Sequence, residues 1–254
     1  MNRLPLATIA LASAVVVAYL FFSAGSLFIP QGELLSLALY SGNSPANVFL
    51  HLFAHLGAKH LLGNLVPLVI FAVVLEYAAG GGAVLAVFFL SGIAASLGFS
   101  LLNPAIALAG ASGGVAGLIG ASALARPKRS LLLLLALPLL IQFIIFPAVD
   151  YGVSLQKHEL EEKQAGLSAQ VRELVAQNKT EEAASANSSL QAVAEQGAAV
   201  DAGVSREATA QTDVTVHVLG ALIGMAYLVV RRPDLVDKSS NEVFALFGRV
   251  RKKK

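Results

Sequence analysis

The chain has no cysteine and no tryptophan among its 254 residues, and only 13% of its residues are charged. Without cysteine, disulfide bonds, a thiolate nucleophile and a thiolate-bound metal are excluded. Soluble domains carry about 25% charged residues, whereas this chain is 56% hydrophobic with a mean hydropathy of +0.70. We therefore predict an integral membrane protein. The sequence has no phosphate-binding loop and no nucleic-acid-binding motif, so we expect no nucleic-acid partner.

Six apolar segments are each long enough to cross a bilayer, which takes about 20 apolar residues in a helix. We therefore expect an all-α membrane protein with six transmembrane helices. A secretory signal peptide is the alternative for the first segment, although its apolar stretch exceeds the ~7–15 residues usual for such peptides. The six segments are 6–29, 49–75, 83–102, 105–125, 131–149 and 214–230.

Positive charges favour one orientation of these segments. Arg3 precedes the first, "RPKR" (126–129) joins the fourth and fifth, and "RR" (231–232) follows the sixth. With six crossings all of them fall on one side, which the positive-inside rule makes cytoplasmic. We predict a multi-pass protein of the plasma membrane with cytoplasmic N- and C-termini. Its parts are helices one to five in 1–150, an extracytoplasmic insertion at 151–212, the sixth helix at 213–231 and a basic tail at 232–254.

The predicted insertion, 151–212, is polar and contains nine acidic and five basic side chains. Leu160, Leu167, Val171 and Leu174 recur at helical spacing. This pattern predicts an amphipathic helix, or a helical hairpin, in the first half. We expect the second half, from residue 181, to be flexible because it is polar and poor in large apolar residues. Two roles stay open: a solvated extension, or an element that senses a substrate or partner.

A serine and a histidine are expected at one depth in the fourth and sixth helices. Ser112 lies 14 residues before Arg126, and His217 lies 14 residues before Arg231. At ~1.5 Å per residue, both lie about 21 Å above the cytoplasmic boundary. Polar groups inside a membrane span are costly and commonly functional. An imidazole in reach of a serine can take its hydroxyl proton, which is the minimum for nucleophilic catalysis.

A histidine and an asparagine in the second segment bracket the same depth. His60 and Asn64 lie 16 and 12 residues before Glu76, which marks the inner end of that segment. They are four residues apart and therefore share one helix face. Their N–H groups are candidate donors to an oxyanion.

Glycines recur at four-residue spacing beside both catalytic candidates. Gly113 and Gly117 follow the serine, and Gly220 and Gly224 follow the histidine. Small residues at this spacing let helix backbones approach closely in membranes. We therefore predict that the fourth and sixth helices pack closely and bring the serine and the histidine within hydrogen-bond reach.

Together these residues resemble the motifs of the rhomboid family of intramembrane serine proteases. The second segment carries "HLFAHLGAKHLLGN" (51–64), the fourth carries "GASG" (110–113), and the sixth carries "HVLGALIG" (217–224). Order, spacing and helix number agree with that family. The resemblance covers 6–150 and 213–231, and it leaves out the insertion and the tail.

The resemblance implies a protease that uses a serine–histidine pair without an aspartate. Ser112 would be the nucleophile and His217 the general base. The backbone N–H of Ser112 and the side chains of His60 and Asn64 would hold the oxyanion. No cofactor and no metal ion are needed, and the partners are transmembrane protein substrates and the lipid bilayer. The supporting positions are Glu76 with a structural role, His51 and His55 near the active-site cavity, and Gly110, Gly113, Gly220 and Gly224.

The chain also departs from the family pattern. The first loop of the family commonly carries a Trp-Arg pair, and Asn47 and Val48 stand near that place. Ala116 stands where an aromatic residue often packs on the catalytic histidine, and Val216 replaces the usual alanine before it. Asp213, one turn before that histidine, is expected to cap the sixth helix.

Three other functions stay open. An inactive or catalytically weak rhomboid-like protein that binds transmembrane helices needs neither Ser112 nor His217, and this chain has both. A histidine metal site is disfavoured because His55 and His60 lack a carboxylate partner at ligand spacing. A transporter would need charged residues deep in several segments, yet Glu76 lies only at an edge. The oligomeric state is open as well.

Overall fold

A computed structural model describes residues 4–209 and 213–241, and helices account for nearly all of its regular structure. Over these residues the β contacts are two isolated bridges, Phe28–Gly57 and Leu39–Leu108. The expected all-α class is confirmed. The described residues form two compact units, one of residues 4–141 with 213–241 and the other of residues 142–209.

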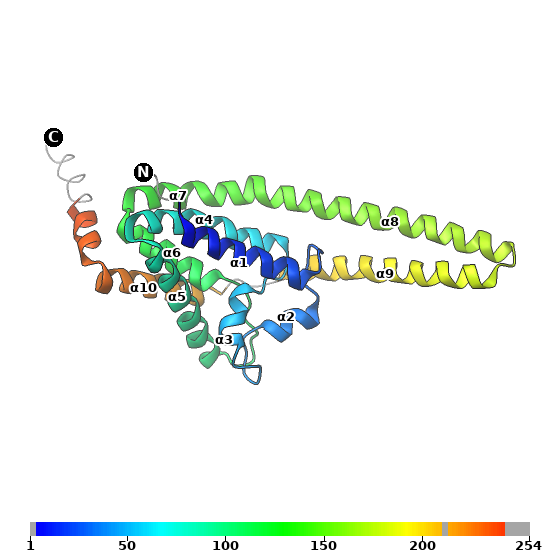
Figure 1. Ribbon diagram of the computed structural model, residues 1–254, viewed down its shortest axis with the longest axis horizontal. Helices are drawn as coiled ribbons and strands as arrows, with labels where there is room; N and C mark the ends of the chain where they lie inside the picture. Colours follow the sequence, from blue (N-terminus) through cyan, green and yellow to red (C-terminus); the bar gives the residue numbers. More distant parts are fainter. Residues whose placement is uncertain (1–3, 210–212, 242–254) are drawn as a thin grey trace. The chain divides into compact units, whose positions relative to one another are not determined.

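The first unit is a bundle in which α6 packs against four other helices, α4, α5, α7 and α10, while α1 packs on α4 and α5 (Figure 1). Short helices α2, α3 and η1 lie in the connection between α1 and α4. A further helical stretch, 233–241, follows α10. The bounds are α1 Leu6–Ser23, α2 Gln31–Leu37, α3 Asn47–Leu50, η1 His51–Phe53, α4 Ala58–Ala79, α5 Gly81–Leu102, α6 Ser112–Ala125, α7 Pro127–Leu140 and α10 Val214–Arg231.

Five helical runs of the described residues are long and apolar enough to cross a membrane, so this is a multi-pass membrane protein. Four of them are α1, α4, α5 and α10, and the fifth is the run Pro127–Ala176. The remaining apolar helix, α6, has 14 residues and is shorter than those five.

Two of the six expected segments begin too early. The segment expected at 105–125 is helical only from Ser112, because the backbone of Leu108 pairs with that of Leu39 in both directions. The segment expected at 49–75 continues as one helix only from Ala58, because Gly57 is fully extended. Hydropathy does not reveal these starts, since both preceding loops are apolar.

The helices α6 and α10 touch through their backbones. A Cβ added to Gly220 would collide with the carbonyl oxygen of Gly113, and one added to Gly224 would collide with that of Gly117. Only glycine fits at such a contact. The predicted close packing of the two glycine-bearing helices is confirmed.

Glu76 ties the start of α1 to the end of α4. Its carboxylate accepts hydrogen bonds from the backbone N–H of Ala7 (3.0 Å) and of Thr8 (2.8 Å), and from the Thr8 hydroxyl (2.6 Å). The first N–H groups of a helix have no acceptor inside the helix, so this carboxylate satisfies two of them.

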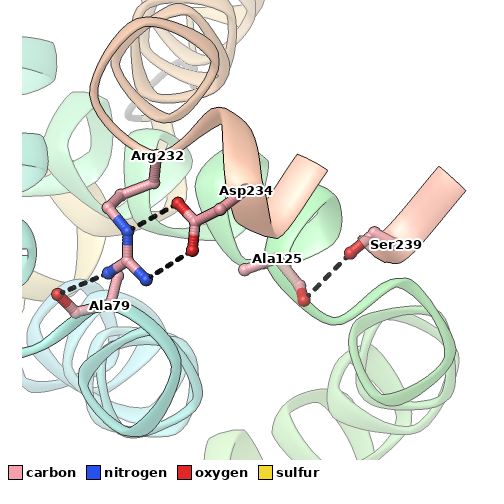
Figure 2. Close-up of polar contacts among 5 residues, drawn as sticks. All are labelled: Ala79, Ala125, Arg232, Asp234 and Ser239. Carbon is pink, nitrogen blue, oxygen red and sulfur yellow. Dashed lines mark hydrogen bonds and ion pairs between the residues drawn. The ribbon is translucent and has the colours of Figure 1, made fainter. Parts of the chain in front are cut away.

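Side chains that follow α10 bind the last residues of α4 and α6 (Figure 2). The Arg232 guanidinium donates to the carbonyl of Ala79, the last residue of α4, at 3.3 Å and pairs with Asp234 at 2.9 Å. The hydrogen bond from Arg232 to Asp234 lowers the pKa of the Asp234 carboxyl. The Ser239 hydroxyl donates to the carbonyl of Ala125, the last residue of α6, at 3.1 Å. The last carbonyls of a helix lack partners inside it, so these donors fix the ends of α4 and α6.

The second unit is a helical hairpin of α8 (Phe146–Ala176) and α9 (Thr180–Thr209), which lie side by side (Figure 1). A π-helical segment, η2 (Ile141–Ile145), precedes α8. Lys157 of α8 forms an ion pair with Asp201 of α9.

The expected flexibility from residue 181 onwards is wrong, because α9 occupies 180–209; residues 210–212 lie outside the described part. The buried side of α9 carries Ala183, Ala186, Val200 and Gly203. Three of these four residues are small, so the average hydropathy of the segment does not reveal the buried side. Alanine, which is frequent in this helix, has the highest helix propensity.

Replacing Gly220 by alanine should lower the free energy of unfolding by about 1–3 kcal/mol, because the added methyl group meets the Gly113 backbone. Thermal unfolding of the purified protein in detergent measures this loss. Gly98→Ala is the matched control, since its methyl group would only touch Leu219 Cδ1 at 3.7 Å. If both variants unfold at the wild-type temperature, the backbone contact of α6 and α10 is contradicted.

Candidate active site

Ser112 is the first residue of α6, and the turn before it requires a glycine. Gly110 has a φ of +120°, which side chains rarely adopt. Its N–H donates to the carbonyl of His51 at 2.8 Å. The turn is thereby fixed from the backbone, and the Ser112 side chain is left partly exposed. The N–H of Ser112 belongs to the first turn of a helix, whose N–H groups have no acceptor inside the helix.

His60 and Asn64, from the first half of α4, lie against this turn. A Cβ on Gly110 would stand 2.8 Å from both Cε1 and Nε2 of the His60 ring and 3.9 Å from Nδ2 of Asn64. The absent side chain of Gly110 therefore makes room for the imidazole. The structure brings both candidate oxyanion donors next to the turn that leads into Ser112.

Hydrogen bonds orient both of these side chains as donors. The backbone N–H of Leu56 donates to Nδ1 of His60 at 3.3 Å. Since Nδ1 accepts, the neutral imidazole carries its hydrogen on Nε2, the nitrogen that faces Gly110. The Asn64 amide donates one hydrogen to the carbonyl of His60 at 2.9 Å, and a primary amide has a second hydrogen to donate.

His217, in the first turn of α10, carries its hydrogen on the other ring nitrogen, Nδ1. Its Nδ1 lies 2.6 Å from the backbone carbonyl of Asp213. A carbonyl only accepts, so Nδ1 carries the hydrogen and Nε2 of the neutral ring is the basic nitrogen. The Asp213 carboxylate accepts from the N–H groups of Thr215 (2.7 Å) and Val216 (3.3 Å). The expected helix cap is confirmed, and the carbonyl of the capping residue orients the imidazole.

The first turns of α6 and α10 face each other. A Cβ on Gly113, the residue after Ser112, would stand 3.2 Å from Cγ1 of Val216, the residue before His217. The site therefore gathers side chains from α4, α6 and α10, the helices that carry the sequence motifs.

The two earlier histidines are buried, and one of them contacts His60. His51 is 1% exposed and His55 is 0% exposed. Nδ1 of His51 donates to the carbonyl of Asn47 at 2.7 Å, and Nδ1 of His55 donates to that of Phe53 at 3.2 Å. The His55 ring packs edge-on against His60, with 5.1 Å between ring centroids.

Asn47 has a structural role that the sequence pattern did not reveal. It is 1% exposed, and its amide donates to the carbonyls of Ser36 (2.7 Å) and Ala38 (3.0 Å). Asn43, four residues earlier, also donates to Ala38, at 2.9 Å. The two asparagines cross-link the loop between α1 and α4, where the expected Trp-Arg pair is missing.

Ala116 and Glu76, two further positions from the sequence analysis, contribute to helix packing. Ala116 is buried in α6 at 7% exposure. Glu76 bonds α1 and takes no part in the site. In the described ranges, no three side chains of histidine, cysteine, aspartate or glutamate are grouped as metal ligands.

Comparison with known proteins identifies the family of the chain. The family model described as Rhomboid domain matches residues 43–169, which is half of the chain. The match includes Ser112, His60 and Asn64, and it ends before α10. No curated protein and no solved structure matches the chain. The chain belongs to the rhomboid family.

Proposed function

We propose that this protein is an intramembrane serine protease that hydrolyses peptide bonds of transmembrane substrates near the outer face of the membrane. Membership of the rhomboid family supports this function, since its members are usually such proteases. The observation that carries the proposal is that two histidines near the start of α6 carry their hydrogen on different ring nitrogens. His217 presents a basic nitrogen, and His60 presents an N–H.

In the proposed reaction, His217 acts first as a base and His60 then acts as a hydrogen-bond donor. Nε2 of His217 takes the hydroxyl proton as Oγ of Ser112 attacks the carbonyl carbon of the scissile bond. The negative oxygen then accepts hydrogen bonds from the Ser112 N–H, His60 and Asn64. Collapse of the intermediate breaks the C–N bond, and His217 returns the proton to the leaving amine. A water molecule hydrolyses the resulting ester by the same steps.

The short length of α6 suits a site within the membrane layer. Its 14 residues rise about 21 Å, which is less than the ~30 Å hydrocarbon core. Because α4, α5, α7 and α10 surround α6, the non-helical turn before it can lie at membrane depth without facing lipid. We propose that α6 is the fourth of six crossings and that Ser112 is reached by water from the outer side.

The remaining topology follows from the charges. We propose that the basic helix ends lie in the cytoplasm of a plasma-membrane protein, with both termini on that side. The hairpin of α8 and α9 then belongs to the outer side. A rhomboid-like protein that binds transmembrane helices without cutting them is the second candidate, and family membership alone fits it equally well.

A fluorescent fluorophosphonate should label the detergent-solubilised protein at Ser112. Ser112→Ala should abolish labelling, and His217→Ala should slow it by more than about 10³-fold, because the serine loses its base. Gel fluorescence after timed incubation measures both effects. His158→Ala is the matched control, since His158 lies exposed on α8.

Absence of labelling in a folded wild-type protein would favour the non-cleaving candidate. Labelling that survives Ser112→Ala would contradict the choice of nucleophile.

Asn64→Ala should reduce the rate of fluorophosphonate labelling by about 10²–10³-fold, because one donor to the developing oxyanion is removed. Asn103→Ala is the matched control. Its amide makes the same bond to the carbonyl four residues earlier, Phe99, at 3.2 Å, but at the end of α5. Equal rates for the two variants would remove Asn64 from the oxyanion site.

A further inference from the structure

A groove of about 650 Å³ lies between α5 and α10 on the surface of the bundle. Its walls include Ala86, Ala94 and Ala226, and they are apolar except for Tyr227 and Arg231. Its lining residues span positions 86–94 of α5 and 223–231 of α10. Eight helical steps rise about 12 Å, which is close to one leaflet of a ~30 Å hydrocarbon core.

Polar groups gather at the basic end of this groove. Tyr227 and Arg231 are four residues apart on one face of α10. Arg232 is engaged by Asp234 and by the carbonyl of Ala79 (Figure 2). Arg231 forms no ion pair within residues 4–209 and 213–241. The Arg231 side chain is exposed, so its charge can reach a ligand in the groove at the membrane boundary where α10 ends.

We propose that the groove binds one phospholipid with an anionic headgroup. An acyl chain would lie along the alanines, and the phosphate would accept hydrogen bonds from the Arg231 guanidinium and the Tyr227 hydroxyl. Arginine binds phosphate through two parallel N–H groups, and basic side chains at the membrane boundary attract anionic lipids. The volume lies in the range of small-ligand pockets, and the surface is too short for most of a ~30 Å transmembrane helix.

Binding at this groove has a consequence for the bundle. The lipid would contact α5 and α10 together, and α10 carries His217 at its other end. An occupied groove would therefore hold α10 against α5 mainly beyond Gly224, the last of the glycine contacts with α6.

Native mass spectrometry of the full chain, titrated with phosphatidylglycerol or phosphatidylcholine of identical acyl chains, tests this proposal. Wild type should bind phosphatidylglycerol about fivefold more tightly, the preference expected from one arginine. Arg231→Gln should abolish the preference. Ala226→Leu fills the groove from an exposed position and should weaken binding of both lipids at least fivefold.

Two matched controls should leave both affinities unchanged. Ala136→Leu adds the same bulk at an exposed position of α7, and Arg129→Gln removes a charge at the start of α7. Equal binding of the two lipids by wild type, or unchanged binding in Ala226→Leu, would overturn the proposal. A wild-type dimer that Ala226→Leu dissociates would also overturn it, because a second copy of the chain would then occupy the groove.

Discussion

The backbone contact between α6 and α10 is the constraint on which the rest of the site depends. Gly113 and Gly117 meet Gly220 and Gly224 so closely that a single methyl group would collide with a carbonyl oxygen. Helix association in a membrane lacks the usual hydrophobic driving force and relies on such close packing. The contact begins one residue after Ser112. It therefore brings the start of one helix to the start of the other, where the motif histidine lies.

The backbone, rather than buried carboxylates, orients the two histidines. A carbonyl of the helix cap fixes His217 as an acceptor at Nε2, and a loop N–H fixes His60 as a donor at Nε2. Buried charges within a membrane are costly, whereas peptide groups are already present and uncharged. The single carboxylate at the cap serves two backbone N–H groups instead. Peptide groups of the helix cap and of the loop before α4 thus set which ring nitrogen carries the hydrogen in each histidine.

The sequence predicted the helical class, the membrane location, the family and the glycine contact, because each depends on residue type and spacing alone. It did not predict where two helices begin, since the loops before Ser112 and Ala58 also contain many apolar residues. It was wrong about α9, which is helical and packs on α8 although few of its buried residues are large. The nitrogen that carries the hydrogen in each imidazole depends on a neighbouring backbone group. Only coordinates reveal that group, as they reveal the cross-links made by Asn47.

A disulfide across the contact tests its geometry most directly, because the chain has no cysteine of its own. A Cβ on Gly113 would stand 3.2 Å from Val216 Cγ1, so cysteine side chains at these two positions would be in contact and within reach of a disulfide. The variant Gly113→Cys with Val216→Cys, cut at a protease site inserted between α8 and α9, should remain one band on a non-reducing gel. The pair Gly113→Cys with Val218→Cys, which faces away, should separate into two fragments. Separation of both pairs would contradict the facing first turns and with them the proposed serine–histidine pair.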